Sequence, residues 1–158
     1  MKENSRPLVS VVTPAYNQAS YLSATIESVL SQDYPHIEYR VIDDGSTDRT
    51  PEILESYKGR VPCESHANQG QTATINKGWA QSQGAILTWL NSDDTFLPGA
   101  VSKAVAFFSS FRDLTASGFW SSKVGVDDLR YIGNTYVREW KGCPDEALKK
   151  LGVSYEAD

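Results

Sequence analysis

The sequence predicts an α/β fold in which helices flank a mostly parallel sheet. Short apolar runs alternate with segments of helical periodicity over residues 8–108. Strands that alternate with helices favour a parallel sheet with right-handed crossovers. Two acidic clusters, at residues 43–46 and 91–94, each follow a strongly β-like run. Because an open parallel sheet binds ligands beyond the carboxyl ends of its strands, we expect both clusters at one crevice.

The first strand, the first helix and the second strand are predicted from hydrophobic patterning. Residues 8–13 are a short apolar run that ends at Pro14, which is typical of a buried strand. Residues 21–31 place their aliphatic side chains on one side of a helix, with Ser20 as the candidate cap. Residues 39–42 predict the second strand.

The following elements are predicted mainly from helix-end signals. Thr50 as a capping residue and Pro51 at the first helical position indicate the start of a helix. A weak third strand is expected within residues 60–65. Residues 72–83 predict a third helix, with Gly84 as its C-cap.

The fourth strand is the most hydrophobic and covers residues 85–90. A helix is expected to begin at Pro98 and to reach Phe108. Beyond residue 109 glycines break the pattern into short segments that fit a hairpin or edge strands. Residues 145–151 are a candidate for a short helix.

Length and composition limit the possible classes of protein. The 158 residues fit one domain, 1–158, which we expect to have a core at 7–108 and an irregular part at 109–158. The net charge of −5 argues against a sequence-independent nucleic-acid binder. An acidic surface also repels phosphates, so a phosphorylated ligand would need a metal bridge or a helix N-terminus.

Cysteine usage and hydropathy indicate the compartment. Cys63 and Cys143 have neither disulfide density nor metal-ligand spacing, which favours reduced thiols in a cytoplasmic protein. No apolar run approaches the roughly 18 residues that span a bilayer. The sequence leaves open a peripheral membrane contact and assembly into a homo-oligomer.

Three segments carry side chains suited to a ligand, and each has an ordinary structural alternative. In the loop after the first strand, Tyr16 could stack on a planar base and Asn17 could bond it, or the loop could be a simple turn. Asp43 and Asp44 could accept from a uracil imide or ribose, or they could form an Asx-turn and a helix cap. In Asn91–Asp94 the carboxylates suit Mg²⁺ or Mn²⁺, or they could mark the entry to a helix.

Other site types are weak or disfavoured. A glycine loop at residues 68–71 precedes the third helix, which is a generic phosphate signal. His36 and His66 have no partners at zinc spacing and are expected to be surface or loop residues. Neither a P-loop nor a dinucleotide-binding glycine motif is present.

Six segments together resemble the family 2 glycosyltransferases, in the order and spacing of that family. They are residues 9–17, 26–32, 43–50, 68–70, 76–78 and 90–94. The resemblance covers Pro7 to about Phe108 and implies a GT-A fold, a Rossmann-like, mostly parallel sheet flanked by helices. It also implies inverting sugar transfer from a nucleotide-diphosphate donor, such as a UDP-sugar, to a saccharide or lipid-linked acceptor, with Mg²⁺ or Mn²⁺.

The resemblance also implies roles for individual residues. Tyr16 would stack on the base, Asp44 with Asp43 would hold uracil and ribose, Asp93 would contact ribose or sugar, and Asp94 would ligate the metal. The full set of expected donor contacts is Pro14, Tyr16, Asn17, Asp43, Asp44, Asn76 and Asp93, and the expected metal ligands are Asp94 and Asp93. Asn91 stands where many members have the first Asp of an Asp-x-Asp motif.

The acceptor side of the site is expected to differ from the family. Its members supply an acidic general base well past the metal motif, and Asp158 is the candidate here. The acceptor-side helices that usually follow are missing, so we expect a truncated acceptor part. The alternative is a non-catalytic nucleotide-sugar-binding module completed by another subunit. A receiver-like signalling domain is disfavoured, because Pro14–Tyr16 replaces the acidic pair expected after its first strand.

Overall fold

A computed structural model describes residues 6–106, 129–132 and 135–138 of the chain. These residues contain a six-stranded sheet in the order β3-β2-β1-β4-β6-β5. The first four strands in this order run parallel, and the hairpin β5–β6 adds two antiparallel strands beside β4. The strands are β1 (Val9–Ala15), β2 (Ile37–Asp43), β3 (Cys63–Ser65), β4 (Ile86–Trp89), β5 (Leu129–Ile132) and β6 (Thr135–Arg138).

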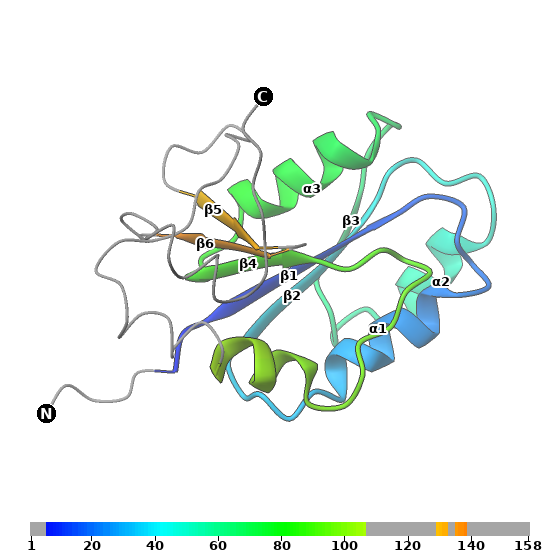
Figure 1. The fold of residues 1–158 in the computed structure, drawn as a ribbon. Helices are drawn as coiled ribbons and strands as arrows, with labels where there is room; N and C mark the ends of the chain where they lie inside the picture. The colour runs from blue at the N-terminus through cyan, green and yellow to red at the C-terminus, as the bar shows by residue number, and fades with distance from the viewer. Residues whose placement is uncertain (1–5, 107–128, 133–134, 139–158) are drawn as a thin grey trace, which may run out of the picture.

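Helices cover both faces of this sheet, as Figure 1 shows. The labelled helices are α1 (Leu22–Leu30), α2 (Thr50–Ser56) and α3 (Gln71–Ala80). A further helical segment covers residues 100–106 and lies on the face of α1 and α2, whereas α3 lies on the opposite face. The mostly parallel α/β sheet flanked by helices predicted from the sequence is therefore confirmed.

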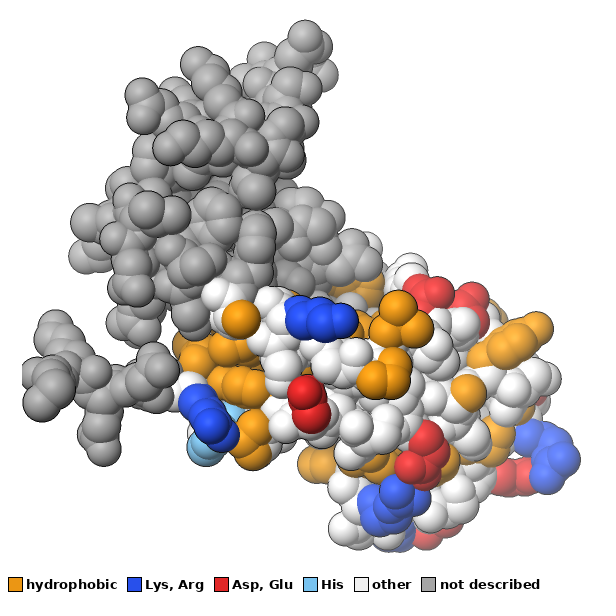
Figure 2. All heavy atoms as spheres, turned by 60° about the horizontal axis from the view of Figure 1, so that its bottom comes forward, with side chains coloured by type: hydrophobic (Ala, Val, Ile, Leu, Met, Phe, Trp, Pro, Cys, Tyr) orange, Lys and Arg blue, Asp and Glu red, His pale blue; other side chains and the backbone are white. Residues whose placement is uncertain are grey.

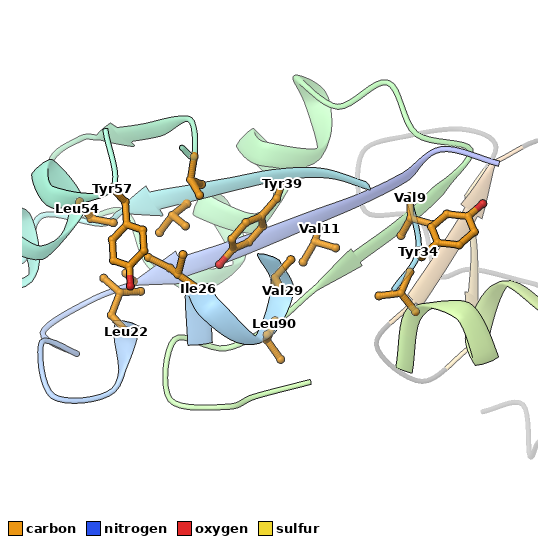
Figure 3. Close-up of a cluster of buried hydrophobic side chains, with 14 of the residues drawn as sticks. Val9, Val11, Leu22, Ile26, Val29, Tyr34, Tyr39, Leu54, Tyr57 and Leu90 are labelled. Atoms are coloured by element: carbon orange, nitrogen blue, oxygen red, sulfur yellow. The ribbon is translucent and has the colours of Figure 1, made fainter. Parts of the chain in front are cut away.

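Two apolar clusters fill the spaces between the sheet and these helices. On the α1 face, Leu22, Ile26 and Val29 pack with Val11 and residues of the neighbouring strands, as Figure 3 shows. On the α3 face, the alternate strand residues Val12, Ile42 and Leu87 pack with Ile75 and Trp79. Successive strand side chains point to opposite faces, so the nearly continuous apolar runs of β1 and β2 supply both clusters.

Glycine permits the close approach of α3 to the sheet. A Cβ placed on Gly78 would lie 2.6 Å from Val12 Cγ1 and 3.1 Å from Ile42 Cδ1. Since Val12 and Ile42 are fully buried, the methyl group would have no room. Gly78 therefore sets the distance between α3 and the carboxyl ends of the strands.

The first strand does not end before Pro14, as the sequence predicted, but continues to Ala15. The ladder from β1 to β4 ends with the bond from Leu90 N–H to Val12 O, at 3.0 Å. Pro14 is the next β1 residue to face β4, and it has no N–H to donate. Pro14 keeps its pairing with β2, opposite Ile42, so the strand goes on while β4 separates from it.

Three predicted helix ends are wrong, and two of the predicted end residues make long-range contacts instead. Tyr21, not Ser20, is the N-cap residue of α1, and Arg49 rather than Thr50 is that of α2. The Thr50 hydroxyl instead accepts a hydrogen bond from Gln18 N–H, at 3.1 Å. Gln81, not Gly84, is the C-cap of α3, and a Cβ at Gly84 would collide with the Ser10 hydroxyl.

The remaining predicted elements agree in type and differ at their ends. The weak third strand and the helix after Pro98 are present, the latter described over residues 100–106. The hairpin expected beyond residue 109 is β5–β6. The candidate helix at residues 145–151 lies outside the described residues.

Candidate functional site

A cavity of about 390 Å³ lies where the carboxyl ends of β1, β2 and β4 meet. This volume is within the usual range of small-molecule sites. Its lining residues are Pro14, Ala15, Tyr16, Gln18, Asp44, Asn68, Gly70, Gln71, Asn91, Ser92 and Asp93. The strand order changes direction between β1 and β4, and ligands bind at such switch points in open α/β sheets. Because Pro14 ends the ladder to β4, the two strands separate where the cavity begins.

The loop after β1 presents Tyr16 to this cavity. Tyr16 is 48 % exposed, so its ring is accessible to a ligand in this cavity. Asn17 follows with a positive φ of 53°, and its side-chain oxygen accepts from Thr47 N–H at 2.8 Å. The Asn17 amide therefore ties the β1–α1 loop to the β2–α2 loop, outside the cavity lining. An exposed ring on a loop held in this way can stack on a planar ligand.

The two adjacent aspartates after β2 make different contacts. Asp43 is buried, and its two oxygens accept from Ser46 N–H at 3.0 Å and from the Ser65 hydroxyl at 2.8 Å. Its contacts close the turn after β2 and join β2 to β3, and Asp43 is absent from the cavity lining. This is the Asx-turn alternative that the sequence left open.

Asp44 lines the cavity and holds the loop before α3. Its carboxylate is 3 % exposed and accepts from Gln69 N–H at 2.8 Å and from Gly70 N–H at 2.9 Å. His66 Nδ1 lies 3.4 Å from Asp44 Oδ1, although the sequence suggested no role for this histidine. Both carboxylate oxygens are therefore fixed in position at the cavity wall.

Gly45 allows the two loops to approach each other. It has a positive φ of 77°, and a Cβ there would lie 2.8 Å from Asn68 N. Only glycine adopts this conformation without strain and leaves room for the facing backbone. The residue thus brings the 68–70 loop against the turn that carries Asp44.

The second acidic cluster is held by α1. The Thr25 hydroxyl lies 2.9 Å from Ser92 O and 2.8 Å from Asp94 O, and it is fully buried. Sequence patterning gave no signal for Thr25, since a lone threonine in an amphipathic helix is ordinary. It fixes the turn in which Asp93 lines the cavity and Asp94 does not.

The donor groups of this turn fit a hard divalent cation. Asp93 and Asp94 are both exposed, and neither carboxylate is neutralised by a basic side chain among the described residues. Within the described part of the chain there is no group of three or more His, Cys, Asp or Glu side chains arranged for a metal. Mg²⁺ does not need such a cage, because it is commonly held by one or two carboxylates, water and substrate phosphates.

Asp48 further stabilises the contact between the β1–α1 loop and the β2–α2 loop. Its carboxylate accepts from Ala19 N–H at 3.1 Å and from Thr50 N–H at 2.9 Å. Slight burial raises the pKa of Asp48, but these hydrogen bonds, with Thr50 first, outweigh it and hold the pKa below its usual value. The ionised form therefore joins the start of α2 to the loop that carries Tyr16.

The structure brings together only part of the expected site. Pro14, Tyr16, Asp44 and Asp93 line one cavity, although they come from the ends of three different strands and the loops that follow them. The expected contacts outside its lining are Asn17, Asp43, Asn76 and Asp94. Asn76 is half-buried inside α3, and Asp158, the candidate base, lies outside the described residues.

Solved structures identify the class of this fold. The chain is similar to S. aureus TarS residues 1–349 in complex with UDP-GlcNAc, with a TM-score of 0.63 and 22 % identity over 94 % of this chain and 48 % of that chain. It is equally similar, with a TM-score of 0.63 and 20 % identity, to the mannosyltransferase PcManGT from Pyrobaculum calidifontis in complex with GDP-Man and Mn²⁺, covering 95 % of this chain and 48 % of that one. These similarities show the GT-A fold.

Sequence similarity then identifies the family. Residues 10–151 match Glycosyl transferase family 2, and the chain belongs to that family. A Bacillus subtilis (strain 168) protein named "Putative teichuronic acid biosynthesis glycosyltransferase TuaG" is 38 % identical over 109 residues, which are 66 % of this chain and 43 % of that protein. A Haemophilus influenzae protein named "Uncharacterized glycosyltransferase" is 39 % identical over 105 residues, which are 64 % of this chain and 42 % of that protein.

The chain therefore spans less than half the length of these curated relatives. Within the described residues, no helix is long and apolar enough to cross a membrane. The face that carries α1 and α2 has acidic and basic side chains interspersed over its described residues, as Figure 2 shows. Among the described residues, this face shows no extended basic surface of the kind that binds nucleic acid.

Proposed function

We propose that this chain binds a nucleotide-diphosphate sugar, specifically a UDP-sugar, and transfers the sugar with inversion to a saccharide or lipid-linked acceptor. The observation that carries the proposal is the convergence of Tyr16, Asp44 and Asp93 on one cavity at the switch point of the sheet. The reaction would take place in the cytoplasm, with membrane contact made through a lipid-linked acceptor.

Tyr16 and Asp44 would bind the nucleoside. The exposed Tyr16 ring offers a face for the base. Each Asp44 oxygen already accepts one backbone N–H, and each has a second lone pair for a base imide or a ribose hydroxyl. Because the carboxylate is buried and fixed, it would favour a base with an N–H in that position. Asn17, Asp43 and Asn76 would then act by shaping the loops around the donor.

Asp93 and Asp94 would hold Mg²⁺ or Mn²⁺ beside the diphosphate. When bound, this ion would offset the negative charge of the diphosphate as it departs. Asp93 lines the cavity and would also reach the ribose or the sugar. The acidic turn alone would repel the diphosphate, so the charge of this site supports a metal-dependent donor.

The transfer would form one bond and break another. The acceptor oxygen forms a bond to C1 of the sugar, while the bond from C1 to the phosphate oxygen breaks and its electrons leave with the nucleoside diphosphate. A general base takes the proton of the acceptor hydroxyl. Asp158 is our proposed base.

Solved relatives support the donor class. TarS is described with UDP-GlcNAc and with UDP, and PcManGT with GDP-Man and Mn²⁺. All three complexes contain a nucleotide that carries a diphosphate, whereas the base differs. We favour uracil because the carboxylate of Asp44 and the exposed ring of Tyr16 line the same cavity.

The proposal is tested first by binding and then by turnover. A thermal-shift screen of nucleotide sugars with Mn²⁺ should show the largest shift with a UDP-sugar, and calorimetry should show that EDTA weakens UDP binding sharply. Equal UDP affinity with and without metal would contradict the role of Asp94. Donor binding without hydrolysis or transfer across an acceptor panel would instead favour a non-catalytic binding module.

A further inference from the structure

Two side-chain amides link the start of α3 to the proposed metal site. Gln71 Nε2 donates to Asn91 Oδ1 at 2.8 Å, and Asn91 Nδ2 donates to Asp94 Oδ2 at 3.0 Å. Asp94 N–H also bonds to Asn91 O at 3.1 Å, which closes the turn between them. The three residues form a hydrogen-bond relay that joins elements 20 residues apart in the sequence.

The chemistry of Asp94 fixes the direction of this relay. An ionised carboxylate only accepts hydrogen bonds, so Asn91 must turn its Nδ2 toward Asp94. The Oδ1 of Asn91 then faces Gln71, which must donate. Turning either amide by 180° would set two acceptors or two donors against each other.

We infer that Gln71 and Asn91 are positioning residues, which hold the carboxylate of Asp94 in one orientation for a divalent cation. The relay engages Oδ2 of Asp94, while Oδ1 makes no hydrogen bond to the described residues and stays available as a ligand. The inference rests on the proposed function, since it assigns the relay to the same donor site.

The relay requires an amide rather than a carboxylate at position 91, because the residue there must both accept and donate a hydrogen bond. An aspartate there would place a second carboxylate about 3 Å from Asp94, without a proton to share between them. The amide supplies a donor and no charge. Gln71 also directly follows Gly70, whose N–H binds Asp44, so the start of α3 supports both Asp44 and, through Asn91, Asp94.

Two substitutions of Gln71 separate the relay from simple charge attraction. Gln71→Leu removes the donor, and we expect it to weaken the Mn²⁺-supported affinity for UDP by about threefold to tenfold, the usual effect of one hydrogen bond. Gln71→Glu should weaken this affinity more, because its carboxylate would draw Asn91 Nδ2 away from Asp94. If charge alone mattered, the added carboxylate near the cation would strengthen Mn²⁺ binding instead.

The experiment uses the full 158-residue chain and two readouts. Calorimetry gives the UDP affinity with Mn²⁺ and with EDTA, and the electron paramagnetic resonance signal of free Mn²⁺ gives the metal affinity without turnover. Gln83→Leu is the matched control, since Gln83 is exposed on the α3–β4 connection, away from the carboxyl ends of the strands. We expect this control to bind UDP and Mn²⁺ like the wild type.

A double mutant tests whether Gln71 acts through Asn91. If it does, the combined Gln71→Leu and Asn91→Leu variant should bind Mn²⁺ no more weakly than Asn91→Leu alone. Additive losses of Mn²⁺ affinity in the double mutant would overturn the inference, and so would tighter Mn²⁺ binding by Gln71→Glu than by Gln71→Leu. In both cases Mn²⁺-dependent UDP binding by the wild type would still support the proposed function. Absence of Mn²⁺-dependent UDP binding in the wild type would overturn both.

Discussion

Replacing Asp44 with asparagine should destabilise the protein through the loop before α3. The two Asp44 oxygens accept from Gln69 N–H and Gly70 N–H at 2.8 and 2.9 Å, and the carboxylate is 3 % exposed. Asparagine offers one oxygen, and its NH₂ group would face the other backbone N–H. One amide proton therefore loses its acceptor, at a cost of about 1–3 kcal/mol.

We expect the free energy of unfolding to fall by about 2 kcal/mol in Asp44→Asn, or about 4–8 °C in melting temperature for a chain of this size. Urea unfolding followed by circular dichroism measures the first quantity, and a thermal scan measures the second. Asp93→Asn is the control. It removes an exposed carboxylate with no hydrogen bond to the described residues, so its stability should stay within about 0.5 kcal/mol of the wild type. A melting temperature of Asp44→Asn equal to that of the wild type would show that the two backbone bonds to Asp44 do not stabilise the loop.

Three further substitutions test other parts of the account. Asp94→Ala should remain folded, because its side chain is exposed, but should lose the Mn²⁺-dependent part of UDP binding in calorimetry; an unfolded variant would favour a purely structural turn. Partial burial raises the pKa of Glu38, but hydrogen bonds to its carboxylate, first that from Ser10, outweigh burial and lower the pKa below 4.5. The ionised carboxylate therefore stabilises the fold above pH 4.5. The loss of stability in Glu38→Gln should be largest above pH 4.5 and should shrink as the pH falls below it. Urea titrations across pH would contradict this if the difference stayed constant. Gly45→Ala should lower the free energy of unfolding by about 1–3 kcal/mol, because its Cβ would lie 2.8 Å from Asn68 N; an unchanged melting temperature would show that the loop moves freely.

The sequence was sufficient to predict the layers of the fold and the edge of the sheet where the cavity lies. The β-like runs at residues 39–42 and 85–90 mark parallel strands, and the connectivity puts their carboxyl ends at the same edge of the sheet. The acidic clusters after these strands therefore had to meet. The positions of strand ends follow from connectivity alone and do not depend on side-chain orientation.

Side-chain orientation is what the sequence could not supply. Asp43 and Asp44 are identical neighbours, yet only Asp44 lines the cavity, because successive side chains at a strand end point in opposite directions. Thr50 and Gly84 have the composition of helix caps but serve contacts with Gln18 and Ser10 instead. These contacts join residues far apart in the chain, so local propensity could not reveal them.

The most direct measurement is a crystal structure of the chain with UDP and Mn²⁺. We expect the uracil ring to lie against Tyr16 with its imide N–H at Asp44, and an anomalous difference peak for Mn²⁺ at coordination distance from Asp94 or Asp93. A UDP molecule bound on another surface, or in this cavity with no Mn²⁺ beside either carboxylate, would contradict this expectation.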